Sequence, residues 1–228
     1  MTTNRAICTI IAKNYLAFAR TLCETYRRLH PEDRCFVVVV DEHKDLIDPA
    51  EETFELIGVE ELGIPDFYPK FAFKYNITEL STAVKPYLLE LLLRRRGVDK
   101  LLYIDPDIIV LQKLDRLYEA LDRSDIVLTP HLDTDFPDDG RQPDDSTIMR
   151  AGMFNLGFLG VNSSENANNF LTWWKSKLFS KCVIDPCAGY FVDQKFVDLA
   201  LFLFDGIHIE KDTGYNVAIH NLHSRRLS

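Results

Sequence analysis

An apolar stretch interrupted by two closely spaced carboxylates most constrains how this chain can fold. Residues 101–110 read Leu-Leu-Tyr-Ile-Asp-Pro-Asp-Ile-Ile-Val, so Asp105 and Asp107 have strongly apolar neighbours on both sides. Such a run is typical of a strand buried on both faces of a sheet, here followed by a second extended segment. An ionised carboxylate in these surroundings is costly unless a partner offsets its charge. The stretch therefore predicts a buried strand that ends beside a cationic group.

A divalent metal ion is one candidate for that cationic group. Carboxylate oxygens are hard ligands that suit Mn²⁺ or Mg²⁺, and Pro106 restricts the backbone between the two aspartates. The alternative is a strand end whose acids cap a neighbouring helix or pair with an arginine, because short motifs often occur without a function. Both interpretations place charged groups at the end of a central strand.

The N-terminal third of the chain alternates strand-like and helical patterns. Residues 5–11 are rich in β-formers, residues 15–30 place apolar side chains on one stripe of a helix, and residues 34–40 form a second apolar run. This alternation is typical of βαβ units and predicts an α/β fold with a mostly parallel twisted sheet flanked by helices. Asp41 follows the second run, where ligands of open α/β sheets bind, and is either a turn residue or a ligand of a nucleotide ribose.

Later segments continue the alternation. We expect a helix over residues 81–95 that begins at Ser81 and carries Lys85 in its first turns. The other predicted elements are helices over 114–121 and 164–179, a helix opening at Asp193-Gln194, and strands over 125–129, 153–161 and 207–209. With 228 residues, 46% of them hydrophobic, the chain is long enough for one large domain with a full core. We predict a single domain over residues 1–228.

Residues 131–147 are the least regular part of the sequence. This acidic segment holds six aspartates, two prolines and one glycine, which predicts a flexible surface loop that is either a lid or simply solvated. Its spacing does not fit an EF-hand. No Gly-x-Gly-x-x-Gly follows the first strand and the chain has no P-loop motif, so a metal ion would carry more of any phosphate chemistry.

Charge and cysteine usage restrict the partners. A formal net charge of −9 argues against nucleic acid or an anionic membrane surface as a partner. The N-terminus lacks an apolar signal core and no apolar run reaches the length of a membrane span, from which we expect a soluble, cytoplasmic protein without a transmembrane segment. Cys8 and Cys35 are expected to be buried thiols, and Cys182 and Cys187 have no second pair to complete a zinc site. A disulfide between the latter two is not expected in a reducing compartment.

Taken in order, several motifs of this chain resemble those of one enzyme class. They are Asn14-Tyr15 after the first strand, Lys85 in its helix, Asp105-Pro106-Asp107, Phe154-Asn155-Leu156-Gly157, Asp193-Gln194 and His223. In this order they resemble the GT-A nucleotide-sugar glycosyltransferases, most closely the family-8-like retaining enzymes that include bacterial galactosyltransferases and glycogenin. The resemblance implies a Rossmann-like GT-A domain that transfers a hexose from a nucleotide diphosphate sugar, a UDP-sugar above all, to a hydroxyl acceptor with retention.

The resemblance also implies a metal and diphosphate site. Asp105, Asp107 and His223 would bind Mn²⁺ or Mg²⁺, and the ion would bridge the two donor phosphates and stabilise the nucleoside diphosphate as it leaves. The segment over residues 207–228 would close this site. Further positive charge beside the diphosphate would come from Lys85 and from Arg225 or Arg226.

The remaining implied roles concern the nucleotide and the sugar. Asn14 and Tyr15 match positions that line the nucleotide, with Tyr15 as the candidate for base stacking. Asn155, Asp193 and Gln194 match positions around the donor sugar and the acceptor. They are the catalytic candidates, and Gln194 would present its side-chain amide to the reacting face.

The chain departs from the pattern of these enzymes in three places. Ala12 and Lys13 stand where related enzymes have acids that read uracil, and the residues after His223 are Ser224, Arg225 and Arg226 instead of a Gly and Lys ending. His220 is an alternative metal ligand, because residues three apart in an extended segment face opposite sides and only one of the two histidines would point inward.

Other functions fit parts of the pattern. A non-catalytic GT-A-like binding or scaffold domain would keep the fold without turnover. A sugar-1-phosphate nucleotidyltransferase would normally open with a glycine-rich basic loop, which this chain lacks. An inverting transferase would need a carboxylate base, which Asp193 or an acid of the 131–147 loop would supply. The acceptor is a saccharide, a lipid or a protein, and a homo-oligomer is compatible with the sequence.

Overall fold

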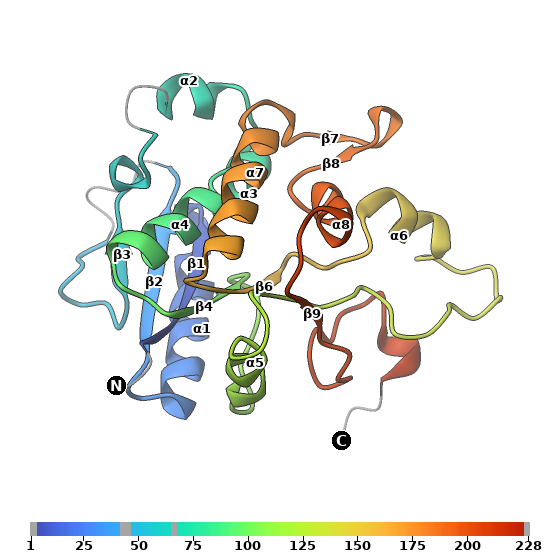
Figure 1. Ribbon diagram of the computed structural model, residues 1–228, viewed down its shortest axis with the longest axis horizontal. Coiled ribbons are helices and arrows are strands. Elements are labelled where there is room, and N and C mark those ends of the chain that lie inside the picture. The colour runs from blue at the N-terminus through green and yellow to red at the C-terminus, as the bar shows by residue number, and fades with distance from the viewer. Residues whose placement is uncertain (1–3, 42–46, 65–67, 226–228) are drawn as a thin grey trace.

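The fold is built on one central sheet flanked by helices. The computed structural model describes residues 4–41, 47–64 and 68–225. Within them, a seven-stranded sheet has the order β3-β2-β1-β4-β6-β5-β9 (Figure 1). Its strands are β1 (Arg5–Ile11), β2 (Arg34–Val39), β3 (Glu55–Ile57), β4 (Lys100–Ile104), β5 (Ile126–Leu128), β6 (Phe158–Asn162) and β9 (Ile207–Ile209). The α-helices are α1 (Leu16–Leu29), α2 (Tyr68–Phe73), α3 (Ile77–Ala83), α4 (Lys85–Arg95), α5 (Asp115–Ala120), α6 (Asp145–Ala151), α7 (Glu165–Lys181) and α8 (Gln194–Leu203), and a small hairpin joins β7 (Ile184–Asp185) to β8 (Tyr190–Phe191).

The sheet is mostly parallel, as the alternating sequence pattern predicts. Strands β3, β2, β1 and β4 run parallel to one another, and β5 runs parallel to β9. Only β6 is antiparallel to its neighbours, β4 and β5. The carboxyl ends of β1, β2 and β4 therefore meet at one edge of the sheet. In the part of the chain that the structure describes, no helix is long and apolar enough to cross a membrane.

Two apolar clusters cover the two faces of the sheet. Successive side chains of a strand point to opposite faces, so β1 contributes Ala6, Cys8 and Ile10 to one cluster and Ile7 and Ile11 to the other. Helices α3, α4, α7 and α8 bury apolar side chains in the first cluster, and α1 and α5 do so in the second. Figure 1 shows α4 and α7 crossing in front of the strands. Both faces are covered, which explains why the central strands are apolar throughout.

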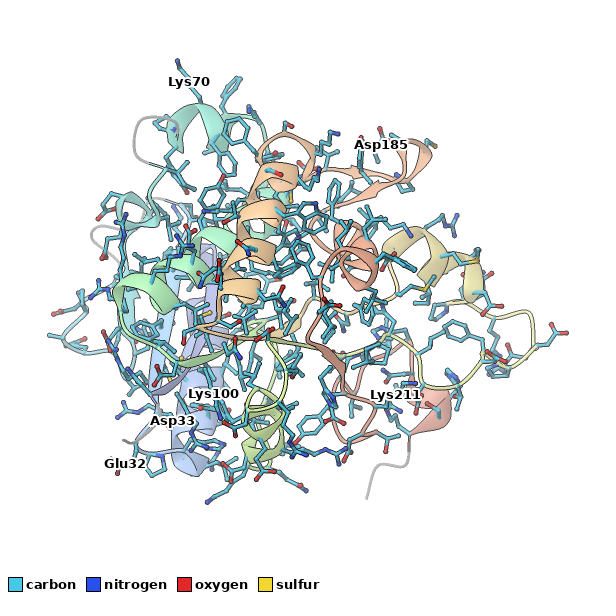
Figure 2. The ribbon with its side chains drawn as sticks, viewed as in Figure 1. Glu32, Asp33, Lys70, Lys100, Asp185 and Lys211 are labelled. Atoms are coloured by element: carbon cyan, nitrogen blue, oxygen red, sulfur yellow. The ribbon has the colours of Figure 1, made fainter. Side chains whose placement is uncertain are left out.

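The amino-terminal edge of the sheet carries a polar network of its own. Asp33 and Lys100, beside the starts of β2 and β4, mark this edge at the lower left of Figure 2. The hydroxyl of Tyr26 donates to Asp33 Oδ2 over 2.6 Å and lies 2.6 Å from the hydroxyl of Tyr118. Lys100 donates to Asp122. These groups satisfy one another, so the edge is stabilised without a ligand.

The prediction of one helix over residues 81–95 is wrong in its boundaries. The segment belongs to two helices, α3 and α4, and α3 begins well before Ser81. Asn76 caps α3 by accepting from the backbone N–H of Glu79, whose carboxylate accepts from the N–H of Asn76 in return. Pro86 lies in the first turn of α4, where its missing N–H costs nothing. The helix start was misread because Ser81, which was taken as the N-cap, lies inside α3.

Three other boundaries differ from the expectation. The extended segment predicted after Asp107 is not a strand. The strand predicted over 153–161 begins only at Phe158, since the preceding residues form a turn. Helix α6 occupies the end of the predicted 131–147 loop, because the side chain of Asp144 caps it by accepting from the backbone N–H of Thr147 over 3.0 Å.

Candidate active site

The first group of predicted site residues lies where β1 and β2 end. Asn14 and Tyr15 form a short 3-10 turn directly after β1, and both side chains are exposed. The ring of Tyr15 lies 5.2 Å from that of Phe18, centroid to centroid. Asp41, after β2, accepts from the backbone N–H of Lys13 over 2.8 Å. This contact supports the interpretation of Asp41 as a turn residue and leaves an exposed aromatic ring at the carboxyl edge.

Asp105 stands at the end of β4 in a half-buried position. Its Oδ1 accepts from the hydroxyl of Tyr103 over 2.6 Å, and its backbone N–H donates to the carbonyl of Gly157 over 2.8 Å. Burial raises the pKa of the Asp105 carboxyl, and the positive charge of Lys85 opposes that shift. Asp107 is exposed. The site therefore holds one carboxylate that lacks full solvation and a second one open to ligands.

Lys85 is buried in an ion pair. Its Nζ lies 2.5 Å from Asp193 Oδ2, and both side chains are only 2% exposed. The same ammonium group donates to the carbonyl of Leu156 over 2.8 Å and lies 4.2 Å from the ring centroid of Tyr103. Trp174 fixes the other partner by donating its indole N–H to the carbonyl of Asp193 over 3.1 Å.

The turn before β6 connects Asp105 to other predicted residues. The N–H of Gly157 donates to Asn155 Oδ1 over 3.0 Å, and Asn155 Nδ2 donates to Asn216 Oδ1 over 2.6 Å. A Cβ on Gly157 would lie 3.0 Å from Asp105 Oδ2, so glycine lets the carboxylate approach the turn. Asn216 was not singled out from the sequence, which carries no signal for this contact beyond its place in the closing segment.

Gln194 is the first residue of α8, next to the buried Asp193. Its side-chain amide donates to the carbonyl of Ala151, at the end of α6, over 3.1 Å. Val192, the residue before Asp193, has a φ of 39°, a left-handed conformation that is rare for a β-branched side chain. Such strained residues persist where the surrounding structure holds them, often at functional sites. Here the strained backbone leads directly into the Asp193-Gln194 pair.

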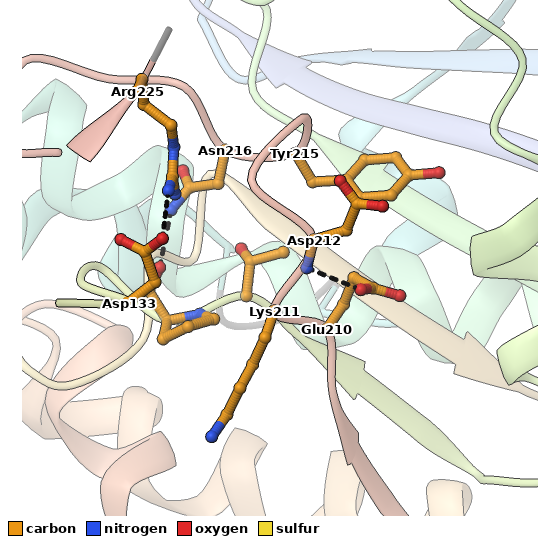
Figure 3. A pocket seen from close by; sticks show the side chains of 9 residues that line it. Asp133, Glu210, Lys211, Asp212, Tyr215, Asn216 and Arg225 are labelled. Carbon is orange, nitrogen blue, oxygen red and sulfur yellow. Dashed lines mark hydrogen bonds and ion pairs between the residues drawn. The ribbon is translucent and has the colours of Figure 1, made fainter. Parts of the chain in front are cut away.

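The C-terminal segment packs against the 131–147 loop. Arg225 Nη1 lies 2.5 Å from Asp133 Oδ2, and the hydroxyl of Ser224 donates to Asp133 Oδ1 over 2.8 Å. Figure 3 shows Asp133, Arg225 and Asn216 around a small pocket under this segment. The Arg225 guanidinium is thus engaged with a carboxylate of the loop. Arg226, the alternative predicted contact for the diphosphate, lies outside the described residues.

Neither candidate histidine joins the two aspartates in this arrangement. His223 Nε2 lies 3.5 Å from Thr134 Oγ1 and its ring packs on Phe136, while His220 packs edge-on against His131. Among the described residues, no three His, Cys, Asp or Glu side chains gather where they could hold a metal ion. The third protein ligand therefore stays a prediction.

The two aspartates nevertheless suit a divalent ion. Carboxylate oxygens are the ligands that Mg²⁺ and Mn²⁺ prefer, and Mg²⁺ is often held by one or two carboxylates together with substrate phosphates and water. A cation beside Asp105 would also offset the cost of keeping a half-buried carboxylate ionised. Asp105 and Asp107 fit the group without a third protein ligand.

Comparison with known proteins identifies the fold. Galactosyltransferase LgtC, solved with donor and acceptor sugar analogs, has a TM-score of 0.52 and 20% identity, over 91% of this chain and 74% of LgtC. Glycosyltransferase GlyE of Streptococcus pneumoniae has a TM-score of 0.57 and 17% identity, over 94% of this chain and 47% of GlyE. This chain has the GT-A fold. The manganese and GDP form of core-mannan synthase A from Aspergillus fumigatus, at a TM-score of 0.51 and 12% identity over 92% of this chain and 73% of that one, has the fold as well.

Sequence comparisons reach less of the chain. No protein-family model matches it. The uncharacterized protein YfnD of Bacillus subtilis is 28% identical over 80 residues, which are 34% of this chain and 26% of YfnD. The match thus spans about a quarter of that protein. The GT-A fold confirms the predicted architecture, and the carboxyl edge of its sheet is where the predicted residues Asn14, Asp105 and Asn155 gather.

Proposed function

We propose that this chain transfers a hexose from a nucleotide diphosphate sugar, with a UDP-sugar as the preferred donor, to a hydroxyl group of a saccharide, lipid or protein. The observation that carries the proposal is Asp105, half-buried at the carboxyl end of a central strand and held by Tyr103 and Gly157. The buried Lys85–Asp193 pair adjoins it. Two proteins of similar fold support a nucleotide-sugar donor in general, since one was solved with donor and acceptor sugar analogs and another with manganese and GDP.

Asp105 and Asp107 would hold Mn²⁺ or Mg²⁺ together with oxygens of the donor diphosphate. When bound, the ion supplies Lewis-acid stabilisation of the negative charge that develops on the diphosphate. The Tyr103 hydroxyl holds the Asp105 carboxylate, and the Gly157 carbonyl holds the backbone N–H of Asp105. His223 would become a ligand only by leaving its contact with Thr134.

The surroundings of Asp193 argue against this residue as the base of an inverting enzyme. A general base of an inverting enzyme must reach the acceptor proton, and a carboxylate that is 2% exposed and ion-paired with Lys85 is poorly placed to do so. Gln194, beside it, would orient the sugar through its amide. Asn14 and Tyr15 would contact the nucleotide, with the exposed Tyr15 ring free for a base to stack on.

The state of the cysteines supports a cytoplasmic setting. All five are free thiols, and Cys8, Cys23, Cys35 and Cys182 are buried. Disulfides form and persist mainly in oxidising compartments, so unpaired thiols suit a reducing one.

A panel assay tests the proposed activity. Purified protein is incubated with UDP-, GDP- and ADP-sugars, Mn²⁺ and a set of saccharide, lipid and peptide hydroxyl acceptors, and release of nucleoside diphosphate is measured alongside the anomeric configuration of the product. We expect one nucleotide class to be consumed, and Asp105→Asn to lower turnover by about a hundredfold or more, because the metal ion that would offset the charge of the leaving group loses a carboxylate ligand. The matched variant Asp122→Asn, at the opposite edge of the sheet, should keep wild-type turnover. Failure to consume any donor, or full activity of Asp105→Asn, would refute the proposal.

A further inference from the structure

Asn216 joins the closing segment to the candidate active site. Its Oδ1 accepts from Asn155 Nδ2 over 2.6 Å, and its own Nδ2 donates to the carbonyl of Pro130 over 2.9 Å. Its backbone has a φ of 54°, a left-handed conformation that asparagine tolerates better than most residues. Its carbonyl accepts from Asn221 Nδ2 over 2.7 Å. The backbone and the side chain of Asn216 are thus both held by hydrogen bonds, which come from Pro130, Asn155 and Asn221.

The contact with Asn155 determines how that side chain is oriented. A carboxamide has an acceptor end and a donor end, and rotation by half a turn exchanges them. The Asn155 oxygen accepts from the N–H of Gly157 and its nitrogen donates to Asn216, so both ends are assigned. Gly157 in turn accepts from the backbone N–H of Asp105. Loss of Asn216 would free one end of the carboxamide and weaken the turn against which Asp105 lies.

We propose that Asn216 is a positioning residue of this site. It acts through Asn155 to hold the Gly157 turn, and with it the Asp105 carboxylate, in a fixed position. The inference rests on the proposed transferase function, since it assigns Asn216 a part in that reaction. It also gives the closing segment a role in the site that does not depend on a histidine ligand. The segment is held in place by Asn221, which is fully buried and donates to the carbonyl of His131 over 3.2 Å.

A double-mutant cycle separates positioning from a structural role. Asn216→Ala should lower kcat for donor consumption by about ten- to a hundredfold with a smaller change in KM, because a misplaced group near the reacting atoms is costly. In an Asn155→Ala background, Asn216→Ala should have little further effect on kcat, because the side chain through which Asn216 acts is already absent. Multiplicative effects of the two substitutions would overturn the proposal.

Asn162→Ala is the matched control. Asn162 is also half-buried and donates its side-chain amide to the carbonyls of Leu121 and Ser124 and to Asp125, away from Asp105. It should lower the unfolding temperature, as Asn216→Ala should, but leave kcat unchanged. An equal loss of kcat in Asn162→Ala would show that both effects reflect only stability.

A second readout does not depend on turnover. The backbone amide of Gly157, observed by nitrogen-15 NMR, should show a steeper temperature coefficient in Asn216→Ala than in wild type or Asn162→Ala, because its hydrogen bond to Asn155 weakens. If no donor is consumed by wild-type protein, the proposed function fails, and this resonance still decides the positioning role. An unchanged Gly157 resonance in Asn216→Ala would refute it.

Discussion

At the residue scale, the buried pair of Lys85 and Asp193 makes a strong prediction about stability. Their charged atoms lie 2.5 Å apart, and each side chain is 2% exposed. Lys85→Met leaves a buried carboxylate without its partner and should lower the free energy of unfolding by about 3–5 kcal/mol. Urea unfolding of Lys85→Met, Asp193→Leu and the double variant measures this. The double variant should be more stable than the sum of the two single losses predicts, and strict additivity would contradict the pairing.

His131 makes the unfolding free energy depend on pH. Burial, and then the neighbouring His220, lower the pKa of His131 to about 4, and its Nδ1–H donates to the carbonyl of Gly152 over 2.8 Å. Well above pH 6.5 the side chain is neutral in both the folded and unfolded states. As the pH falls toward 4, the unfolded state takes up the proton first, so stability is lost.

The expected loss from this group at pH 5 is about 2 kcal/mol. Urea unfolding of wild type and His131→Asn at pH 7 and pH 5 measures this loss. The other titrating groups contribute to both proteins, so the difference between the two proteins reports the contribution of His131. Wild type should lose more stability than the variant over this interval. Equal losses would show that His131 is not held neutral in the folded protein.

At the scale of single elements, two glycines allow the geometry of the site and the packing of the sheet to be tested separately. Gly157 lies just before β6, and Gly160 lies within it. A Cβ on Gly157 would meet Asp105 Oδ2 at 3.0 Å, whereas a Cβ on Gly160 would meet Val127 Cβ at 3.1 Å and Leu102 Cδ2 at 3.2 Å. Gly157→Ala should displace the carboxylate and weaken Mn²⁺-dependent binding of nucleoside diphosphate about tenfold or more. Gly160→Ala should cost about 1–3 kcal/mol of stability by overpacking and leave binding unchanged. Calorimetric titration and urea unfolding distinguish these outcomes, and equal binding by both variants would contradict the site.

Elements with strong local patterns could be predicted from the sequence, and contacts between distant segments could not. β1, α1 and β2 lie within two residues of their predicted bounds, because apolar periodicity over a whole element outweighs any single residue. The helix over 81–95 was misplaced because α3 begins earlier, after its cap Asn76, and a separate helix with Pro86 in its first turn begins at Lys85. The turn before β6 was read as strand since Phe154 and Leu156 are apolar yet buried outside the sheet.

The candidate site shows the same division. Asp105 was singled out because it interrupts a compact apolar motif at the end of a strand, whereas Asn155 was implied by the resemblance alone. The pairing of Lys85 with Asp193 and the bond between Asn155 and Asn216 depend on tertiary placement, which no periodicity encodes. The expected approach of His223 to Asp105 came from resemblance, and the structure places that side chain beside Thr134.

At the scale of the whole molecule, sheet topology explains where chemistry can occur. β1, β2 and β4 are parallel, so the residues that follow them gather at one edge, while the opposite edge is closed by its own polar network. The chain carries a net charge of −9, and an anionic donor would be repelled by such a surface unless local cations offset it. Binding of a nucleoside diphosphate should therefore require the metal and the Asp105 region together.

Thermal unfolding with nucleoside diphosphates, with and without Mn²⁺, tests this central claim most directly. A ligand that binds only the folded protein at about a hundred times its Kd adds about 2.7 kcal/mol, which raises the midpoint by roughly 5–10 °C for a chain of this size. We predict such a rise for one diphosphate only when Mn²⁺ is present, and its loss in Asp105→Asn. A folded wild-type protein whose midpoint does not move with any diphosphate, or moves equally in Asp105→Asn, would contradict the account.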